Sequence, residues 1–247
     1  MTHPLLSVQL YTVRTAFESD ALGALTRLAE IGYTHVEPYR FNVHEEALLR
    51  ALGETGLSAP TAHVKLLGQD LHEIFSAAQR LGISTVIDPF APPERWTNAA
   101  EISAVARDLN EAAVVAAEYG IEVGYHNHAH ELADAANGGT LLDSLIDQLA
   151  PEILIELDTY WVAVAGKDPV AVTTSLSDRL VALHIKDGPG TPETIDQVAL
   201  GRGIMPIRAI INAAPHALRV VELDDSREDL FTALETSRTF LIAEDLV

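Results

Sequence analysis

The sequence contains no cysteine, little positive charge and no long apolar run. The absence of cysteine excludes disulfide bonds, thiolate nucleophiles and cysteine-ligated zinc. Lysine and arginine number 16 against 36 aspartates and glutamates, which gives a formal net charge of −20. Because so acidic a chain repels phosphate backbones, we expect no binding to nucleic acid. No apolar run reaches the roughly 18 residues of a membrane helix and no basic leader precedes the first apolar segment, so we expect a cytoplasmic protein that binds no membrane.

The chain does have the length and apolar content for one sizeable core, with 247 residues of which 48% are hydrophobic. Short β-rich runs alternate with longer segments of helical periodicity. The predicted strands are Leu5–Tyr11, Thr34–Pro38, Ala59–Val64, Ser84–Asp88, Ile121–Asn127, Ile153–Asp158, Leu180–Lys186 and Arg219–Leu223. The predicted helices are Phe17–Ile31, Val43–Leu52, Asp70–Leu81, Ala99–Tyr119, Thr140–Leu149, Pro169–Leu176, Pro206–Ala213 and Asp229–Ala243.

Eight successive strand–helix units are typical of a parallel sheet closed into a (β/α)8 TIM barrel, an α/β fold of about 250 residues. An open, doubly wound sheet is the alternative. It is disfavoured because no glycine-rich turn of the dinucleotide-binding type joins a strand to a helix. We therefore expect a single barrel domain over residues 1–247.

Polar residues occupy the C-terminal ends of the predicted strands, where barrel enzymes carry their chemistry. Because side chains alternate along a strand, Glu156 and Asp158 share one face of the sixth strand, and His184 and Lys186 share one face of the seventh. Three further pairs follow the same rule: Glu222 with Asp224, His35 with Glu37, and His63 with Lys65. Hydrogen bonding at the barrel rim would explain any one of them. Together, carboxylates and imidazoles buried at one mouth would be costly without a cation or a substrate. The donor types suit Mn²⁺, Mg²⁺, Co²⁺ or Zn²⁺, with Mn²⁺ favoured.

Several short motifs resemble the sugar phosphate isomerase/epimerase family, whose barrels are related to xylose isomerase. The resemblance covers nearly the whole chain, and the order and spacing of the motifs carry it rather than any one of them. The motifs are SVQLY at 7–11, GYTHVE at 32–37, YHNH at 125–128 followed by Glu131, LDTYW at 157–161, HIKD at 184–187, GRG at 201–203 and VELD at 221–224. Such barrels include ketose epimerases, hydroxypyruvate isomerases, inosose and dehydroshikimate dehydratases, and an apurinic endonuclease branch.

The resemblance implies one divalent metal ion held by residues that follow strands five to eight. Asp158, His184 and Glu222 match the ligands after the last three strands. Ketose epimerases carry a glutamate within strand five, where Tyr125 and His126 stand here. We therefore assign Glu131 as the fourth ligand, with His126 as the alternative.

The expected chemistry is proton abstraction beside the carbonyl of a sugar or keto-sugar, through an enediolate that the metal stabilises. Candidate bases are Glu131, His128 and Glu222. Predicted substrate contacts, each with a structural alternative, are Glu37, His63, His126, Trp161 and Lys186. For Lys186 the alternative is an exposed loop lysine paired with Asp187, and for Trp161 it is a rim aromatic packed under a loop.

Other functions agree less well with the sequence. The nuclease branch needs a cationic track, which is missing here. A dehydratase that eliminates from a keto-sugar is the main alternative, because the missing strand-five glutamate weakens one of the two bases that an epimerase needs. A non-catalytic sugar-binding barrel is a further alternative. Arg202 is a candidate for a substrate phosphate, or else a solvent-exposed loop residue. Acidic barrels of this size often pair, so a homodimer is the oligomeric state considered for this chain.

Overall fold

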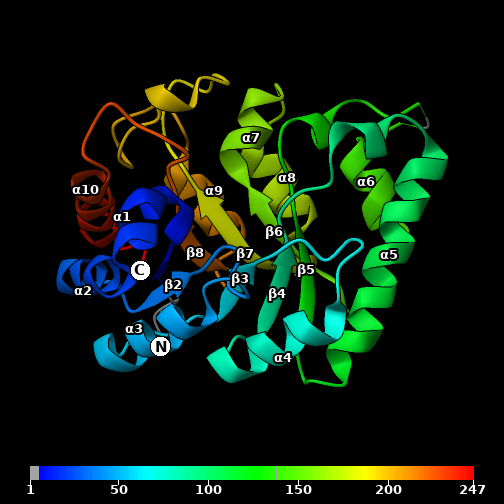
Figure 1. The fold of residues 1–247 in the computed structure, drawn as a ribbon. Coiled ribbons are helices and arrows are strands. Elements are labelled where there is room, and N and C mark those ends of the chain that lie inside the picture. The colour runs from blue at the N-terminus through cyan, green and yellow to red at the C-terminus, as the bar shows by residue number, and fades with distance from the viewer. Residues whose placement is uncertain (1–5, 137) are drawn as a thin grey trace.

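Eight short parallel strands curve around a common axis, with helices packed outside them (Figure 1), in a computed structural model that describes residues 6–136 and 138–247. The hydrogen-bonded strand order is β2-β1-β8-β7-β6-β5-β4-β3. Isolated bridges from His35 to Ser58 and from Tyr39 to His63 link the two ends of this sheet, so the predicted TIM barrel is confirmed. The strands are β1 (Leu6–Gln9), β2 (His35–Glu37), β3 (Thr61–His63), β4 (Thr85–Asp88), β5 (Glu122–His126), β6 (Leu154–Asp158), β7 (Leu180–Ile185) and β8 (Leu218–Val221).

The helices follow the strands in the predicted order. They are α1 (Arg14–Ser19), α2 (Ala21–Ile31), α3 (Glu45–Thr55), α4 (Leu71–Leu81), α5 (Ala99–Ala117), α6 (Leu141–Ile146), α7 (Thr159–Val164), α8 (Pro169–Ser175), α9 (Ile207–Ala213) and α10 (Leu230–Ala243). Short 3-10 turns are η1 (Leu10–Val13), η2 (Pro93–Trp96), η3 (His130–Leu132), η4 (Ser177–Arg179) and η5 (Thr194–Asp196). None of the described helices is long and apolar enough to cross a membrane.

Local capping explains where the helices begin and end. The expected single helix Phe17–Ile31 is wrong, because Asp20 has extended backbone and its side chain accepts a hydrogen bond from the Gly23 amide, which starts α2 there. Gly32 ends α2 with φ of 102°, a left-handed conformation that glycine adopts without a Cβ clash. The unpredicted helix α7 begins because Asp158 caps it.

The strands separate an apolar outer layer from a polar interior. Outward-facing residues such as Val8, Val36 and Val86 are fully buried in the main hydrophobic cluster with the helices. Many of the residues that alternate with them are polar and equally buried, including Gln9 and Glu37, whereas Ile87, Ala182 and Val220 are apolar. Hydrogen bonds therefore cross the barrel interior, and the polar groups meet at the C-terminal ends of the strands.

Candidate metal centre and active site

Asp158 is fixed at the end of β6 by three interactions. Its backbone amide donates to Asn127 Oδ1 at 2.9 Å, and its Oδ1 accepts from the Trp161 amide at 2.9 Å as the cap of α7. The other carboxylate oxygen, Oδ2, is buried and lies 2.9 Å from Lys186 Nζ. The start of α7 thus orients one oxygen of Asp158 into the barrel.

His184 lies beside Asp158 in the register of β6 and β7, and it contacts carboxylates with both ring nitrogens. Nδ1 is 2.7 Å from Glu222 Oε2, and Nε2 is 2.6 Å from Glu37 Oε1. One donor atom from each of Asp158, His184 and Glu222 lies within 4.8 Å of the others. These three side chains form a group that could hold a divalent ion.

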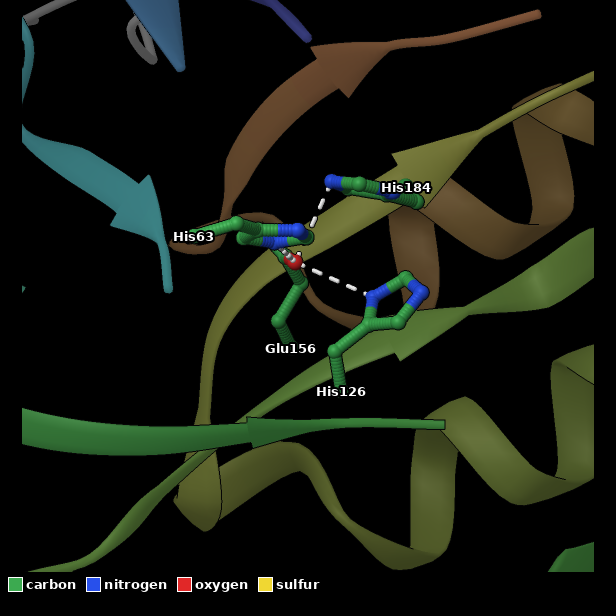
Figure 2. A group of neighbouring side chains, drawn as sticks. All are labelled: His63, His126, Glu156 and His184. Carbon is green, nitrogen blue, oxygen red and sulfur yellow. Dashed lines mark hydrogen bonds and ion pairs between the residues drawn. The ribbon is translucent and has the colours of Figure 1, made fainter. Parts of the chain in front are cut away.

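A second group surrounds Glu156, which precedes Asp158 by two residues on β6 and therefore faces the same side of the strand. Figure 2 shows the rings of His63, His126 and His184 gathered at Glu156 Oε2, at 2.5, 3.0 and 3.1 Å. The sequence placed Glu156 on the face shared with Asp158 but gave it no role. The alternation along β6 was the signal that could have identified it.

Lys186 is the cation at the centre of the first group, and its Nζ contacts three carboxylates. The distances are 2.9 Å to Asp158 Oδ2, 2.8 Å to Glu222 Oε2 and 2.8 Å to Asp224 Oδ2. Only 1% of the residue is exposed, so the alternative of an exposed lysine paired with Asp187 is wrong. Asp187 instead accepts hydrogen bonds from backbone amides of the loop after β7, at Gly188, Gly201, Gly203 and Met205.

The buried charges stabilise one another. Burial opposes the charged form of Lys186, but Asp158, Asp224 and Glu222 hold its pKa well above the ordinary value. Burial would raise the pKa of Glu222, yet Lys186 and His184 keep that pKa well below its usual range. Burial does raise the pKa of Asp158, to about 6. The mouth of the barrel is therefore built to favour a positive charge between Asp158 and Glu222.

A cavity of about 690 Å³ opens above these groups and is large enough for a sugar-sized molecule. Six of the predicted ligands, bases and substrate contacts line it, namely His63, His126, His128, His184, Lys186 and Glu222, and so do Lys65 and Asp224 from the strand-end pairs. Glu37 and Asp158 lie beneath this floor, in contact with His184 and Lys186 respectively. Trp161 is not part of the cavity lining, and its half-buried ring lies 6.2 Å from that of His128, centre to centre.

Glu131 lies outside both groups of ligand atoms and away from the cavity lining. Its Oε1 accepts from the Tyr125 hydroxyl at 3.0 Å and its Oε2 from the His128 amide at 2.9 Å. Of the two residues considered for the fourth ligand position, His126 comes nearer to the first group, with Nε2 3.9 Å from Asp158 Oδ2. In this structure Glu131 holds the loop that carries His128.

Replacing Glu131 should change how stability depends on pH. Burial raises the pKa of Glu131 from 4.5 to about 7, so the folded chain binds this proton more tightly than the unfolded chain does. Wild-type stability should fall as pH rises between these two values. In Glu131→Gln the amide stays neutral, can donate to the Tyr125 oxygen and can accept from the His128 amide. Urea unfolding at pH 5 and pH 8 should show the variant gaining about 2 kcal/mol relative to wild type at the higher pH. If the difference in unfolding free energy between the two proteins is the same at both pH values, Glu131 does not have a raised pKa in the folded chain.

Comparisons with known proteins agree with this architecture. The family model described as xylose isomerase-like TIM barrel matches residues 25–219. Among curated proteins, inosose dehydratase from Geobacillus kaustophilus (strain HTA426) is 26% identical over 189 residues, which cover 66% of this chain and 60% of that protein. The chain thus matches less than two thirds of that relative's length.

Two solved structures show the same fold. A sugar phosphate isomerase/epimerase from Parabacteroides distasonis ATCC 8503 superposes with a TM-score of 0.85 at 22% identity, covering 100% of this chain and 96% of that one. The IOLI protein, whose crystal structure holds a zinc atom, superposes with a TM-score of 0.73 at 15% identity, covering 98% of each chain.

Proposed function

Because this chain belongs to the xylose isomerase-like TIM barrel family, we propose that it is an enzyme that moves a proton beside the carbonyl of a small sugar or keto-sugar. The observation that carries the proposal is the convergence of Asp158, His184 and Glu222 beneath a sugar-sized cavity. The reaction we favour is isomerisation or epimerisation.

The donor set fits a divalent cation. Two carboxylates and one imidazole supply oxygen and nitrogen ligands, and the ammonium group of Lys186 already lies against both carboxylates. Asp158, His184 and Glu222 would hold the ion, and Lys186 would still have Asp224 as a partner, at 2.8 Å from its Nζ. When bound, such an ion supplies Lewis acidity that makes the C–H bond beside a carbonyl more acidic. Mn²⁺ is our first choice among the hard divalent ions, and the zinc atom in the similar IOLI protein makes Zn²⁺ the second.

We assign the proton transfer to His128. Its ring lines the cavity, and its Nδ1 is buried without a hydrogen-bond partner among the described residues. Glu131 positions His128 by accepting from its amide. Lys186 adds a positive charge at the cavity floor, where negative charge develops on the substrate oxygen. The base removes the proton from carbon and returns it to the same or the neighbouring carbon, so atoms balance without a further reactant.

Dehydration of a keto-sugar is the second candidate function. It is favoured by the similarity to an inosose dehydratase and by His126 standing in β5. In this reaction the base removes the proton from the carbon beside the carbonyl. A proton is then returned to the hydroxyl oxygen on the neighbouring carbon, the C–O bond breaks and the group leaves as water, so atoms balance without a further reactant.

His128→Gln should lower turnover by about 10²- to 10⁴-fold, the range expected when a general base is lost. Binding of Mn²⁺ should stay within a factor of three, because His128 belongs to neither group of ligand atoms. His72→Gln is the matched control. His72 lies exposed on α4, and its Nδ1 forms a hydrogen bond with the Tyr119 hydroxyl. Equal turnover in His128→Gln and wild type would remove His128 from the reaction.

Incubation with a panel of keto-sugars in D₂O tests the reaction class. Isomerisation or epimerisation leaves the product mass unchanged apart from added deuterium, whereas elimination shows loss of water. Exchange with none of the sugars, in protein that carries its metal ion, would contradict both versions and favour a sugar-binding barrel.

A further inference from the structure

Two cationic side chains stand apart from the others in this acidic chain. Of the 16 lysines and arginines, 14 donate hydrogen bonds to, or form ion pairs with, described residues. Arg40 and Lys65 do neither with their side chains within the described part of the chain. Both are exposed, and both line the same cavity that the candidate active site occupies.

Neighbouring loops bring these two cations to one wall. Arg40 follows β2 and Lys65 follows β3, and the Arg40 amide donates to the His63 carbonyl at 2.7 Å. The ammonium group of Lys65 lies 5.9 Å from the centre of the Phe90 ring. Arg40 also has a φ of 46°, in the left-handed region that non-glycine residues rarely adopt. Backbone strain at a cavity wall, on a residue with an unpaired charge, points to a role in binding.

The wall and the floor of the cavity carry opposite charges. Glu222 and Asp224 lie on the floor with Lys186, while Arg40 and Lys65 lie on the wall with the amide side chain of Asn42. An anionic group would be repelled by the acidic floor and attracted to this wall. Arg202, the earlier candidate for a phosphate, does not line the cavity, and its Nη1 pairs with Glu228 Oε1 at 2.9 Å.

We propose that Arg40 and Lys65 bind a carboxylate or phosphate group on the end of the substrate that points out of the barrel. The fork of the guanidinium group suits two oxygens of such a group, and the ammonium group adds a point charge. This inference rests on the proposed function only in assuming that the substrate occupies this cavity. It narrows the substrate class from sugars in general to acidic sugars or sugar phosphates.

Calorimetric titration of the full chain tests the inference without requiring turnover. The probes are D-fructose, 2-keto-D-gluconate, D-fructose 6-phosphate and inorganic phosphate, each in 20 mM and 500 mM NaCl. We expect at least one of the two anionic sugars to bind tenfold or more tightly than fructose at low salt, with the advantage shrinking at high salt. Tighter binding of 2-keto-D-gluconate identifies a carboxylate, and tighter binding of the phosphate ester, with inorganic phosphate also bound, identifies a phosphate.

Arg40→Gln and Lys65→Gln should each weaken the anionic sugar about tenfold, as expected for loss of a charge-assisted hydrogen bond, and leave fructose unchanged. Arg202→Gln, which removes a cation outside the cavity, should have no effect. Equal affinity for fructose and both anionic sugars, no binding of any anion, or full affinity in both variants would each overturn the inference. If the anions bind as expected but no sugar exchanges deuterium, the proposed reaction fails while this binding site stands.

Discussion

The His184→Ala substitution is expected to remove divalent-cation binding and turnover together. His184 is the one residue common to both groups of ligand atoms, and its two ring nitrogens contact Glu222 and Glu37. Losing it should weaken Mn²⁺ binding by roughly 100-fold or more, beyond the 10- to 100-fold typical when only a supporting contact of a ligand is lost. Metal content after dialysis and the rise in melting temperature with added MnCl₂ measure this directly.

Two further variants make that result specific. Asp158→Asn keeps the shape of the side chain and its cap on α7 while removing the charge, so it should also lower metal content. His72→Ala removes an exposed histidine from α4 and should leave metal content unchanged. If His184→Ala and Asp158→Asn both keep the wild-type stoichiometry, the ion binds elsewhere.

Lys186→Met should destabilise the metal-free protein and make it depend on the ion. The substitution keeps a long apolar stem but leaves the carboxylates of Asp158 and Glu222 without the ammonium group between them. Removing one partner of a buried ion pair costs about 3 kcal/mol or more. In a chain of this size that loss lowers the melting temperature by about 10 °C.

Added Mn²⁺ should raise the melting temperature of Lys186→Met more than that of wild type, because the ion then meets no competing ammonium group. Lys167→Met is the control, since Lys167 pairs with the exposed Asp134 and lies outside the barrel mouth. A variant with wild-type melting temperature and wild-type Mn²⁺ affinity would show that Lys186 does not balance these carboxylates.

The fold was predictable because most strand–helix units carry local sequence signals for where their elements begin and end. Several strands alternate in polarity, aspartate, asparagine or threonine caps seven of the ten described helices, and glycines such as Gly32 end some of them. The break at Asp20 was missed because the apolar spacing of residues 17–31 continues through it. A cap inside a periodic pattern becomes visible only when the backbone departs from the helix.

The floor of the candidate site was partly predictable from strand parity, which put Asp158, His184 and Glu222 on the interior face. The alternation of side chains along a strand tells which face a residue lies on, but not how deeply it is buried. The sequence therefore did not indicate that Lys186 is buried between two of these carboxylates. Residues in loops do not alternate between two faces, so the same rule cannot place them. The Tyr125 hydroxyl and the His128 amide fix the position of Glu131, and these contacts exist only in the folded chain.

The most direct test of the cation site is anomalous diffraction from crystals of the wild-type protein soaked in MnCl₂. We expect one strong peak between Asp158, His184 and Glu222, with the ammonium group of Lys186 displaced toward Asp224. A peak among His63, His126, Glu156 and His184 would move the ion to the other group, and the absence of any peak inside the barrel would contradict a metal-assisted reaction in this cavity.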